Sequence, residues 1–384
     1  MRAAPAGRAG GAGQSLPAGS APGAPADVTS ITKDAGATVS FLAPASAGSS
    51  PVSSYTVTPY IGASAQAPTT VAAESAGSVT GSNGNTYVQV NVTGLANSTA
   101  YTFTAKAGNS YGTGPESAVS GANTPLSGLV FGDDFNGAAS GPVDPEWWIY
   151  DNRCGYLAQS EVEAYAASHC VLDGSGNLQL TAEHASITVP RYPSDPLYPG
   201  SVTQPWTSGA CQSNTRTYAP SPGNTMTFEV RQKVMADAGN GFWPGFLWLE
   251  GQHYLTAWKT DPDQAGWNTT DQAEIDIAEW PSGQSSTTQF VENTWTSSNP
   301  DHAAPIPGGG YDATAMHVYS VQWKPGVSCK FFLDGVQQHA AASNIAASGA
   351  QFFLLIYLQM VAGGPTTTES CFVDYVRVYD QNLG

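Results

Sequence analysis

Short runs that alternate apolar and polar residues recur along this chain, and clusters of turn-forming residues separate them. Alternation with a period of two is the pattern of a β-strand, whereas no segment of convincing length repeats with the period of a helix. Charged residues make up only 11% of the sequence while it contains 42 Gly and 27 Pro, which favours short strands joined by many turns. The pattern therefore predicts an all-β fold. The clearest runs are residues 38–42, 55–58, 87–92, 101–105, 177–181, 226–234, 318–323, 330–333 and 372–378.

The composition changes along the chain and divides it into two parts. All ten Trp and all five Cys lie at or after Trp147. We predict a flexible Ala/Gly/Pro-rich segment at 1–24, a small β-sandwich at 25–125, a linker at 126–130 and a larger all-β domain at 131–384. A two-sheet sandwich of jelly-roll type is the natural packing for the larger domain.

The charge of the chain limits its partners. The formal net charge is -17 and there is no run rich in Lys or Arg, so nucleic acid and anionic membrane surfaces are poor partners and a neutral ligand fits better. The longest apolar run, 352–361, is about half the length of a membrane-spanning helix. We expect a monomer.

Five widely spaced cysteines lack the close pairs that metal knuckles require, which favours disulfides and an extracellular location, with one cysteine left unpaired. No secretory signal is visible in this numbering, so secretion is an inference.

Three acidic residues, Glu274, Asp276 and Glu279, lie within one apolar segment. On a regular strand Glu274 and Asp276 share one face, but Glu279 falls on the other. A β-bulge near Ile277 or Ala278 would bring all three onto one surface. Mutual repulsion would then raise at least one pKa and give a protonated acid beside an ionised neighbour, as glycoside hydrolysis requires. The alternatives are a solvated acidic edge strand and a cation site.

The first part of the chain resembles a fibronectin type III module. Leu95 and Tyr101 match the tyrosine corner of that family, and residues 50–55 match the entry to one of its strands. Phe41 stands where the family usually has a core Trp. This resemblance implies a spacer or docking unit.

The second part resembles glycoside hydrolase family 16, in its laminarinase-like branch. The segment 274–279 matches the family pattern Glu-x-Asp-x-x-Glu. Further matching segments lie, in the order of the family, at 133–137, 161–165, 228–233, 241–246 and 373–379. The resemblance implies a concanavalin-like jelly roll and retaining hydrolysis. It assigns Glu274 as nucleophile, Glu279 as general acid and then base, and Asp276 as the residue that tunes the pair.

The same resemblance gives a set of substrate-binding candidates. Trp243 is expected to be a sugar platform. Glu229 and Arg231 either hydrogen-bond sugar hydroxyls or form a structural ion pair, and Trp280 either lines the cleft or lies in the core. The full set is Trp243, Glu229, Arg231, Glu161, Trp280, Asn293 and Gln359.

The expected substrate is β-1,3-glucan. Mixed-linkage glucan, other β-glycans, transglycosylation and a lectin-like binding protein remain open, because the chain departs from the family pattern at Ser160, Leu247 and Gln359. No cofactor is expected to be required, and a structural Ca²⁺ on the convex face, as in some relatives, is left open.

Overall fold

The computed structural model describes residues 19–383 apart from 82, 151–160, 191–200, 215–216, 252–272, 282, 284–286, 296–300, 303–305, 308–310 and 348. It confirms the all-β prediction: no α-helix occurs in the described part of the chain, whose two helical turns, η1 (Ala73–Ser75) and η3 (Ala167–His169), are 3-10. None of the described helices has the length and apolar character needed to cross a membrane.

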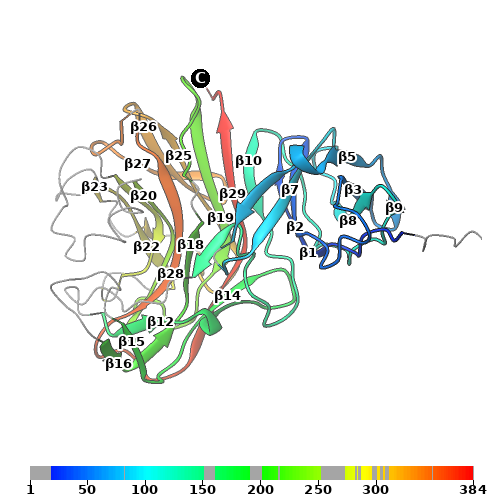
Figure 1. Ribbon diagram of the computed structural model, residues 1–384. Coiled ribbons are helices and arrows are strands. Elements are labelled where there is room, and N and C mark those ends of the chain that lie inside the picture. The colour runs from blue at the N-terminus through cyan, green and yellow to red at the C-terminus, as the bar shows by residue number, and fades with distance from the viewer. Residues whose placement is uncertain are drawn as a thin grey trace, which may run out of the picture.

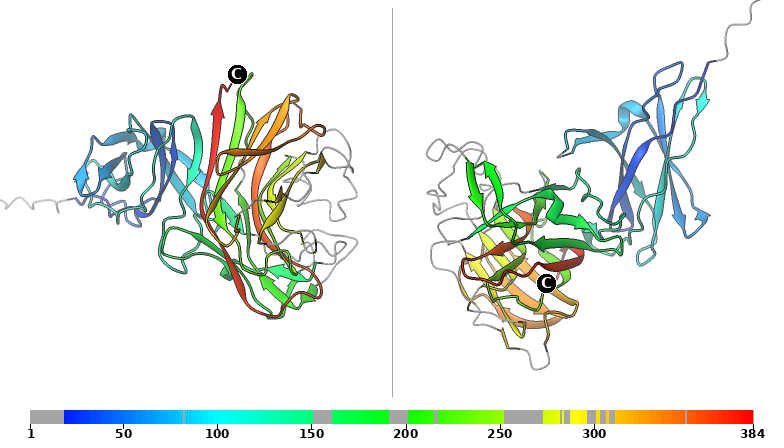
Figure 2. Two further views of the ribbon diagram at one scale, coloured as in Figure 1. Left: turned by 180° about the vertical axis from the view of Figure 1, so that it is seen from behind. Right: turned by 90° about the horizontal axis from the view of Figure 1, so that it is seen from below.

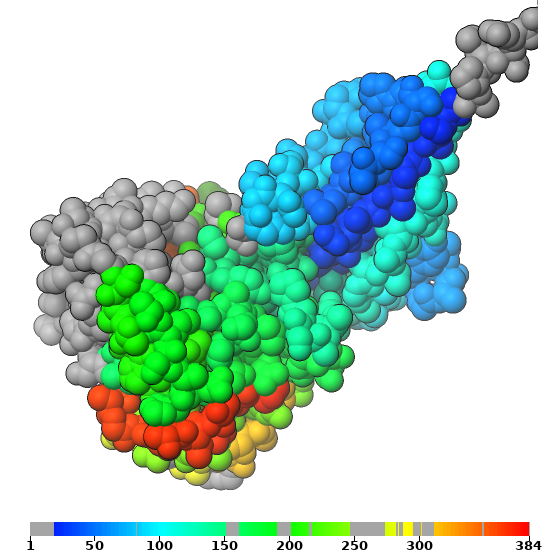
Figure 3. Space-filling view, turned by 60° about the horizontal axis from the view of Figure 1, so that its bottom comes forward, coloured from blue at the N-terminus to red at the C-terminus, as the bar shows by residue number. Residues whose placement is uncertain are grey.

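The first part of the chain is a two-sheet sandwich that forms a separate lobe (Figure 3). One sheet has the order β1-β2-β7-β6, and the other has the order β4-β3-β8-β9 with β5 paired to β3. The strands are β1 (Ala26–Lys33), β2 (Gly36–Leu42), β3 (Ser54–Ile61), β4 (Ser64–Ala65), β5 (Thr69–Ala72), β6 (Gly77–Thr80), β7 (Thr86–Thr93), β8 (Thr102–Asn109) and β9 (Gly112–Thr113).

Two aromatic side chains of this module take the places that the sequence predicted. The Tyr101 hydroxyl accepts the backbone N–H of Ala96 at 3.0 Å, which is the tyrosine corner. Phe41 is fully buried and packs edge-on against Tyr55, with ring centroids 5.3 Å apart. Phe41 therefore has the core role that a Trp has in the family pattern.

The second part consists of two eight-stranded sheets packed face to face (Figure 1). The β19 sheet has the order β13-β14-β29-β19-β25-β26-β27, with β10 paired to β29. Its strands are β10 (Leu129–Asp133), β13 (Cys170–Leu172), β14 (Leu178–Ala182), β19 (Thr225–Lys233), β25 (His317–Lys324), β26 (Ser328–Leu333), β27 (Val336–Ala340) and β29 (Glu369–Gln381).

The β21 sheet has the order β11-β18-β28-β20-β21-β22-β23, with β24 paired to β22. Its strands are β11 (Trp148–Tyr150), β18 (Ala210–Ser213), β20 (Phe242–Gly251), β21 (Glu274–Glu279), β22 (Gln289–Trp295), β23 (Asp301–His302), β24 (Ile306–Pro307) and β28 (Phe352–Met360). Two small pairs, β12 (Glu163–Tyr165) with β17 (Trp206–Ser208) and β15 (Ile187–Pro190) with β16 (Ser201–Gln204), complete this domain.

The core lies between these two sheets. Alternate residues of β19, such as Phe228 and Val230, and alternate residues of β21, such as Ile275 and Ile277, lie in one buried apolar cluster between the sheets. The cluster also holds four cysteines as buried free thiols, namely Cys170, Cys211, Cys329 and Cys371. No disulfide is therefore seen among the four described cysteines, although the Cys170 and Cys211 thiols interact through a hydrogen bond, and Cys154 lies outside the described residues.

The module is docked directly onto the larger domain. β10 begins at Leu129, so the last two residues of the predicted 126–130 linker belong to a strand. The backbone N–H of Asp34 donates to the Leu129 carbonyl at 2.8 Å, and Ile31 of β1 is buried in the core cluster of the larger domain. The β19 sheet, to which β10 belongs, lies between the module and the β21 sheet in both side views (Figures 1 and 2). The outer face of the β21 sheet is thus turned away from the module.

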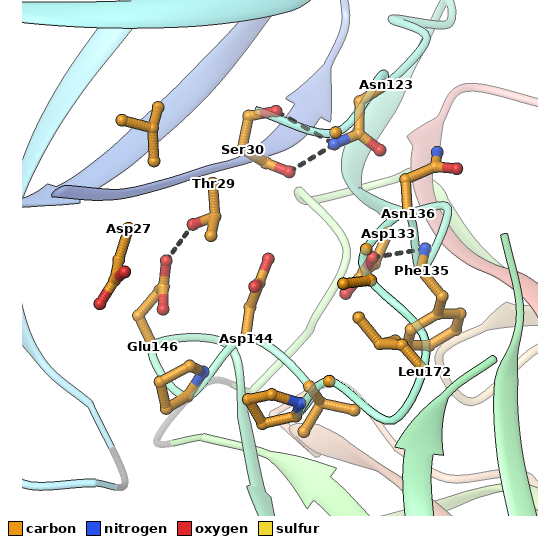
Figure 4. A pocket seen from close by; sticks show the side chains of 18 of the residues that line it. Asp27, Thr29, Ser30, Asn123, Asp133, Phe135, Asn136, Asp144, Glu146 and Leu172 are labelled. Atoms are coloured by element: carbon orange, nitrogen blue, oxygen red, sulfur yellow. Dashed lines mark hydrogen bonds between the residues drawn. The ribbon is translucent and has the colours of Figure 1, made fainter. Parts of the chain in front are cut away.

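A pocket at this junction is lined by four carboxyl groups (Figure 4). Asp27 comes from the module, and Asp133, Asp144 and Glu146 come from the larger domain. The Thr29 hydroxyl donates to Glu146 Oε1, and the lining residues that the structure describes include no Lys, Arg or His. Burial raises the pKa of Asp133 to about 6, and burial also raises the pKa of Asp144 and of Glu146.

We expect Glu146→Gln to stabilise the protein at pH 7.5 and to have little effect at pH 4.5. A carboxyl whose pKa is raised by folding stabilises the native state only while it is protonated, and this contribution is lost as the pH rises through its folded pKa. The expected gain at pH 7.5 is a few degrees in Tm. Thermal unfolding at the two pH values measures it, with the exposed Glu74→Gln as control. Equal shifts at both pH values would contradict the expectation.

Candidate active site

The acidic strand β21 contains the predicted β-bulge. Asp276 lies opposite Asn293 of β22, and Glu279 lies opposite Val291, so three steps along β21 match only two along β22. The extra residue falls at Ile277–Ala278. Such an insertion resets the alternation of side chains that follow it.

The neighbouring strand β20 carries an extra residue at the same level. Phe246 lies opposite Ile356 of β28 and Trp248 lies opposite Leu355, so Leu247 is the additional residue. β20 and β21 nevertheless stay in phase with each other, since Phe246 pairs with Ala278 and Trp248 pairs with Asp276. The irregularity therefore spans two adjacent strands in the middle of the β21 sheet.

The bulge brings the acidic side chains onto one face. Asn293 Nδ2 donates to Asp276 Oδ2 at 3.0 Å and to Glu279 Oε2 at 3.0 Å, so these two carboxyls share a partner. Glu274 precedes Asp276 by two residues and has the same orientation on the strand. Ile275 and Ile277 point the other way, into the core. The three carboxyls thus lie on the outer face of the β21 sheet.

Glu279 has the environment of a protonated acid. Burial raises the pKa of Glu279 well above its usual value, and the neighbouring Asp276 raises it further. Hydrogen bonds oppose part of this shift: Trp243 Nε1 donates to Glu279 Oε1 at 2.8 Å, and the Tyr357 hydroxyl donates to the same oxygen at 3.4 Å. A raised pKa favours the protonated form of Glu279, which is the form that can give a proton to a departing group.

Three of the predicted substrate-binding residues lie around these carboxyls. Trp243 and Asn293 contact Glu279 directly. Gln359 lies opposite Trp243 on β28 and faces the same side as Tyr357, two residues earlier. Its Oε1 is buried and has no hydrogen-bond partner in the described part of the chain. This oxygen could accept a hydrogen bond from a hydroxyl group of a bound sugar.

Glu161 lies beside the end of β28. Its backbone forms a bridge with Val361, two residues beyond Gln359, and its side chain is buried. The position is therefore at the end of β28 that follows Gln359, and β20 lies between β28 and the acidic strand. A direct role in binding sugar stays a prediction.

The other three candidates lie elsewhere. Trp280 is fully buried in the core against Phe290 and Tyr319, because it follows the bulge by one step and turns inward. Glu229 and Arg231 lie on β19 in the other sheet, and they face away from its core because Phe228 and Val230 face it.

Glu229 and Arg231 both interact with side chains of the adjacent strand β29. Arg231 forms an ion pair with Asp374 of the adjacent strand β29. Tyr375 hydrogen-bonds Glu229, whose pKa is raised by burial. Both residues therefore stabilise the pairing of β19 with β29 and have no access to the acidic strand.

Two residues near the site were missed. Tyr357 lies inside an apolar run that is buried on both faces, so its pattern indicated only a core strand. Glu163 accepts the Met360 N–H at 3.0 Å and the Tyr165 hydroxyl at 2.9 Å, and burial raises its pKa to about 7. The signal that could have found Tyr357 is its spacing of two from Gln359.

The described residues contain no group of three or more His, Cys, Asp or Glu side chains arranged to hold a metal ion. The calcium ion left open from the sequence therefore has no cluster of side-chain donors in this part of the chain.

Fold and site together define a glycosidase built on a β-sandwich. The family model for Glycosyl hydrolases family 16 matches residues 168–377, more than half of the chain, and that for Fibronectin type III domain matches residues 20–122. The chain belongs to glycosyl hydrolase family 16.

Solved structures share this fold at low sequence identity. The endo-1,3-beta-glucanase from Streptomyces sioyaensis is 23% identical with a TM-score of 0.52, and the match covers 67% of this chain and 98% of that one. LamAcat from Zobellia galactanivorans is 22% identical with a TM-score of 0.50, covering 66% and 98%. A structure described among endo-acting O-glycanases of the human gut microbiota is 20% identical with a TM-score of 0.51, covering 66% and 90%. A search of curated protein sequences gave no significant match.

Proposed function

We propose that this chain is a retaining endo-β-glycanase that hydrolyses β-1,3-glucan of the laminarin type. The observation that carries the proposal is the setting of Glu279, a buried carboxyl that shares Asn293 with Asp276, lies on the same sheet face as Glu274 and Asp276, and has its pKa raised by burial and by Asp276. A glycan-binding protein without catalysis gains nothing from a buried protonated acid, whereas a glycosidase requires one.

The reaction follows from these roles in two steps. Glu274 attacks the anomeric carbon while Glu279 gives its proton to the glycosidic oxygen, so the carbon–oxygen bond to the leaving sugar breaks and a glycosyl ester forms on Glu274. Glu279, now ionised, then takes a proton from water, which attacks the same carbon and releases Glu274. Asp276 lies between the two glutamates in sequence, and its charge helps to keep the proton on Glu279.

The choice of substrate has separate support. The chain has a net charge of -17, which disfavours a strongly anionic polymer. Two structures that share its fold are an endo-1,3-beta-glucanase and LamAcat. A polysaccharide is too large to enter a cell intact, so we place the enzyme outside the cell, and we expect it to act as a monomer.

Release of reducing sugar from laminarin, curdlan, lichenan, agarose and xyloglucan tests the substrate. We expect the wild type to cut laminarin and curdlan fastest, because both are β-1,3-glucans. Faster cleavage of lichenan would assign a mixed-linkage glucanase. Binding without cleavage of any of the five would overturn the hydrolase proposal.

A further inference from the structure

Tyr357 reaches the general acid from the opposite side to Asn293. Tyr357 is on β28, Glu279 is on β21, and β20 runs between them. Gly245 of β20 pairs with Tyr357 on one side and with Glu279 on the other. The tyrosine ring therefore crosses over β20 at Gly245 to bring its hydroxyl to Glu279 Oε1, 3.4 Å away.

The glycine makes this crossing possible. A Cβ atom on Gly245 would lie 1.9 Å from Tyr357 Cζ and 2.1 Å from its hydroxyl oxygen. Real Cβ atoms do not approach other atoms so closely, so any side chain at this position would displace the ring. The missing side chain of Gly245 therefore leaves the space that the Tyr357 ring occupies.

The hydroxyl remains a proton donor at any working pH. Burial raises the pKa of Tyr357 well above its usual value, and the nearby Glu279 adds to the shift. The ring is 2% exposed and packs with Tyr165, Phe353 and Leu355 in a small apolar cluster. A ring so enclosed has a fixed orientation.

We propose that Tyr357 is a positioning residue for the general acid. It holds Glu279 Oε1 from the β28 side, together with Trp243, while Asn293 holds Oε2 from the β22 side. The carboxyl is thereby fixed at both oxygens, in the orientation that proton transfer to the glycosidic oxygen requires. This inference rests on the proposed role of Glu279 as general acid.

The variant Tyr357→Phe tests the proposal, since it keeps the ring and removes only the hydroxyl. Loss of a donor to Glu279 should raise the pKa of that carboxyl, so the alkaline limb of the kcat profile on laminarin should move up by about half to one pH unit. A less well-held acid should also lower kcat at the optimum roughly 3- to 30-fold, with KM nearly unchanged. The control is Tyr311→Phe, which removes another buried hydroxyl, one that is bonded to Tyr319 in the core instead of to Glu279.

A second readout keeps the test independent of activity. The protonated carboxyl of Glu279 should give an infrared C=O band that is absent from Glu279→Gln, and its titration midpoint should be higher in Tyr357→Phe than in the wild type. If no polysaccharide is cut, the proposed function fails while this titration still reports the contact. An unchanged midpoint, or a pH profile that coincides with that of the wild type at unchanged kcat, would overturn the proposal.

Discussion

Glu274→Gln is expected to lower kcat/KM on laminarin by roughly three to five orders of magnitude, because an amide cannot form the glycosyl ester of the first step. The side chain keeps its size, and the buried framework of β21 around Ile275 and Ile277 is unchanged. Binding of laminarin should therefore survive. Reducing-sugar release and binding by the same purified variant are the two measurements.

A glutamate outside the site provides the control for this variant. Glu183 lies by β14, half exposed and near His169, and Glu183→Gln should leave the activity unchanged. Chemical rescue sharpens the test: with azide present, Glu274→Ala should convert an activated β-glycoside into the α-glycosyl azide in one displacement. Near-normal activity of Glu274→Gln would contradict its assignment as nucleophile.

Glu279→Gln is expected to show a loss that depends on the leaving group. On laminarin the rate should fall by roughly two to four orders of magnitude, because the departing sugar needs a proton. On a 2,4-dinitrophenyl β-glycoside, whose leaving group needs no proton, the first step should remain fast and the glycosyl-enzyme should accumulate. A rapid burst of dinitrophenolate followed by a slow steady state is the expected trace.

The pH dependence adds a second expectation for this variant. The alkaline limb that Glu279 gives to the wild-type profile should disappear, because amides do not titrate in this range. Equal losses of kcat/KM, which reports the first step, on laminarin and on the activated substrate would contradict the assignment of Glu279 as general acid. A loss of folding would reduce both rates as well, so thermal unfolding of the variant accompanies the kinetics.

The strands and the bulge could be predicted from the sequence because both depend on local alternation. Glu274 and Asp276 lie on one face of β21, and the apolar residues between them lie on the other. On a regular strand Glu279 would fall on the apolar face, so one extra residue was needed to bring it to the face of the other two acids. The same extra residue turns Trp280 into the core, a consequence that the prediction did not follow through. The tyrosine corner was likewise visible, since it needs only residues a few positions apart.

The sequence pattern did not show which strands share a sheet. Glu229 and Arg231 alternate correctly on β19, but that strand belongs to the other sheet of the sandwich and not to the sheet of the acidic strand. Tyr357 was hidden for a related reason, because every residue of β28 is buried and alternation between its faces is lost. The docking of the module depends on pairing between β10 and β29, about 250 residues apart, which no local pattern encodes.

The central claim is that Glu274 and Glu279 act by double displacement, and the anomeric configuration of the first product tests it most directly. Laminarin digested by the wild type in an NMR tube should release β-anomers first, with α-anomers appearing only as the sugars mutarotate. This order is the result that a glycosyl ester on Glu274 predicts. Initial release of α-anomers would mean that water attacks the sugar directly, and Glu274 could then not be the nucleophile.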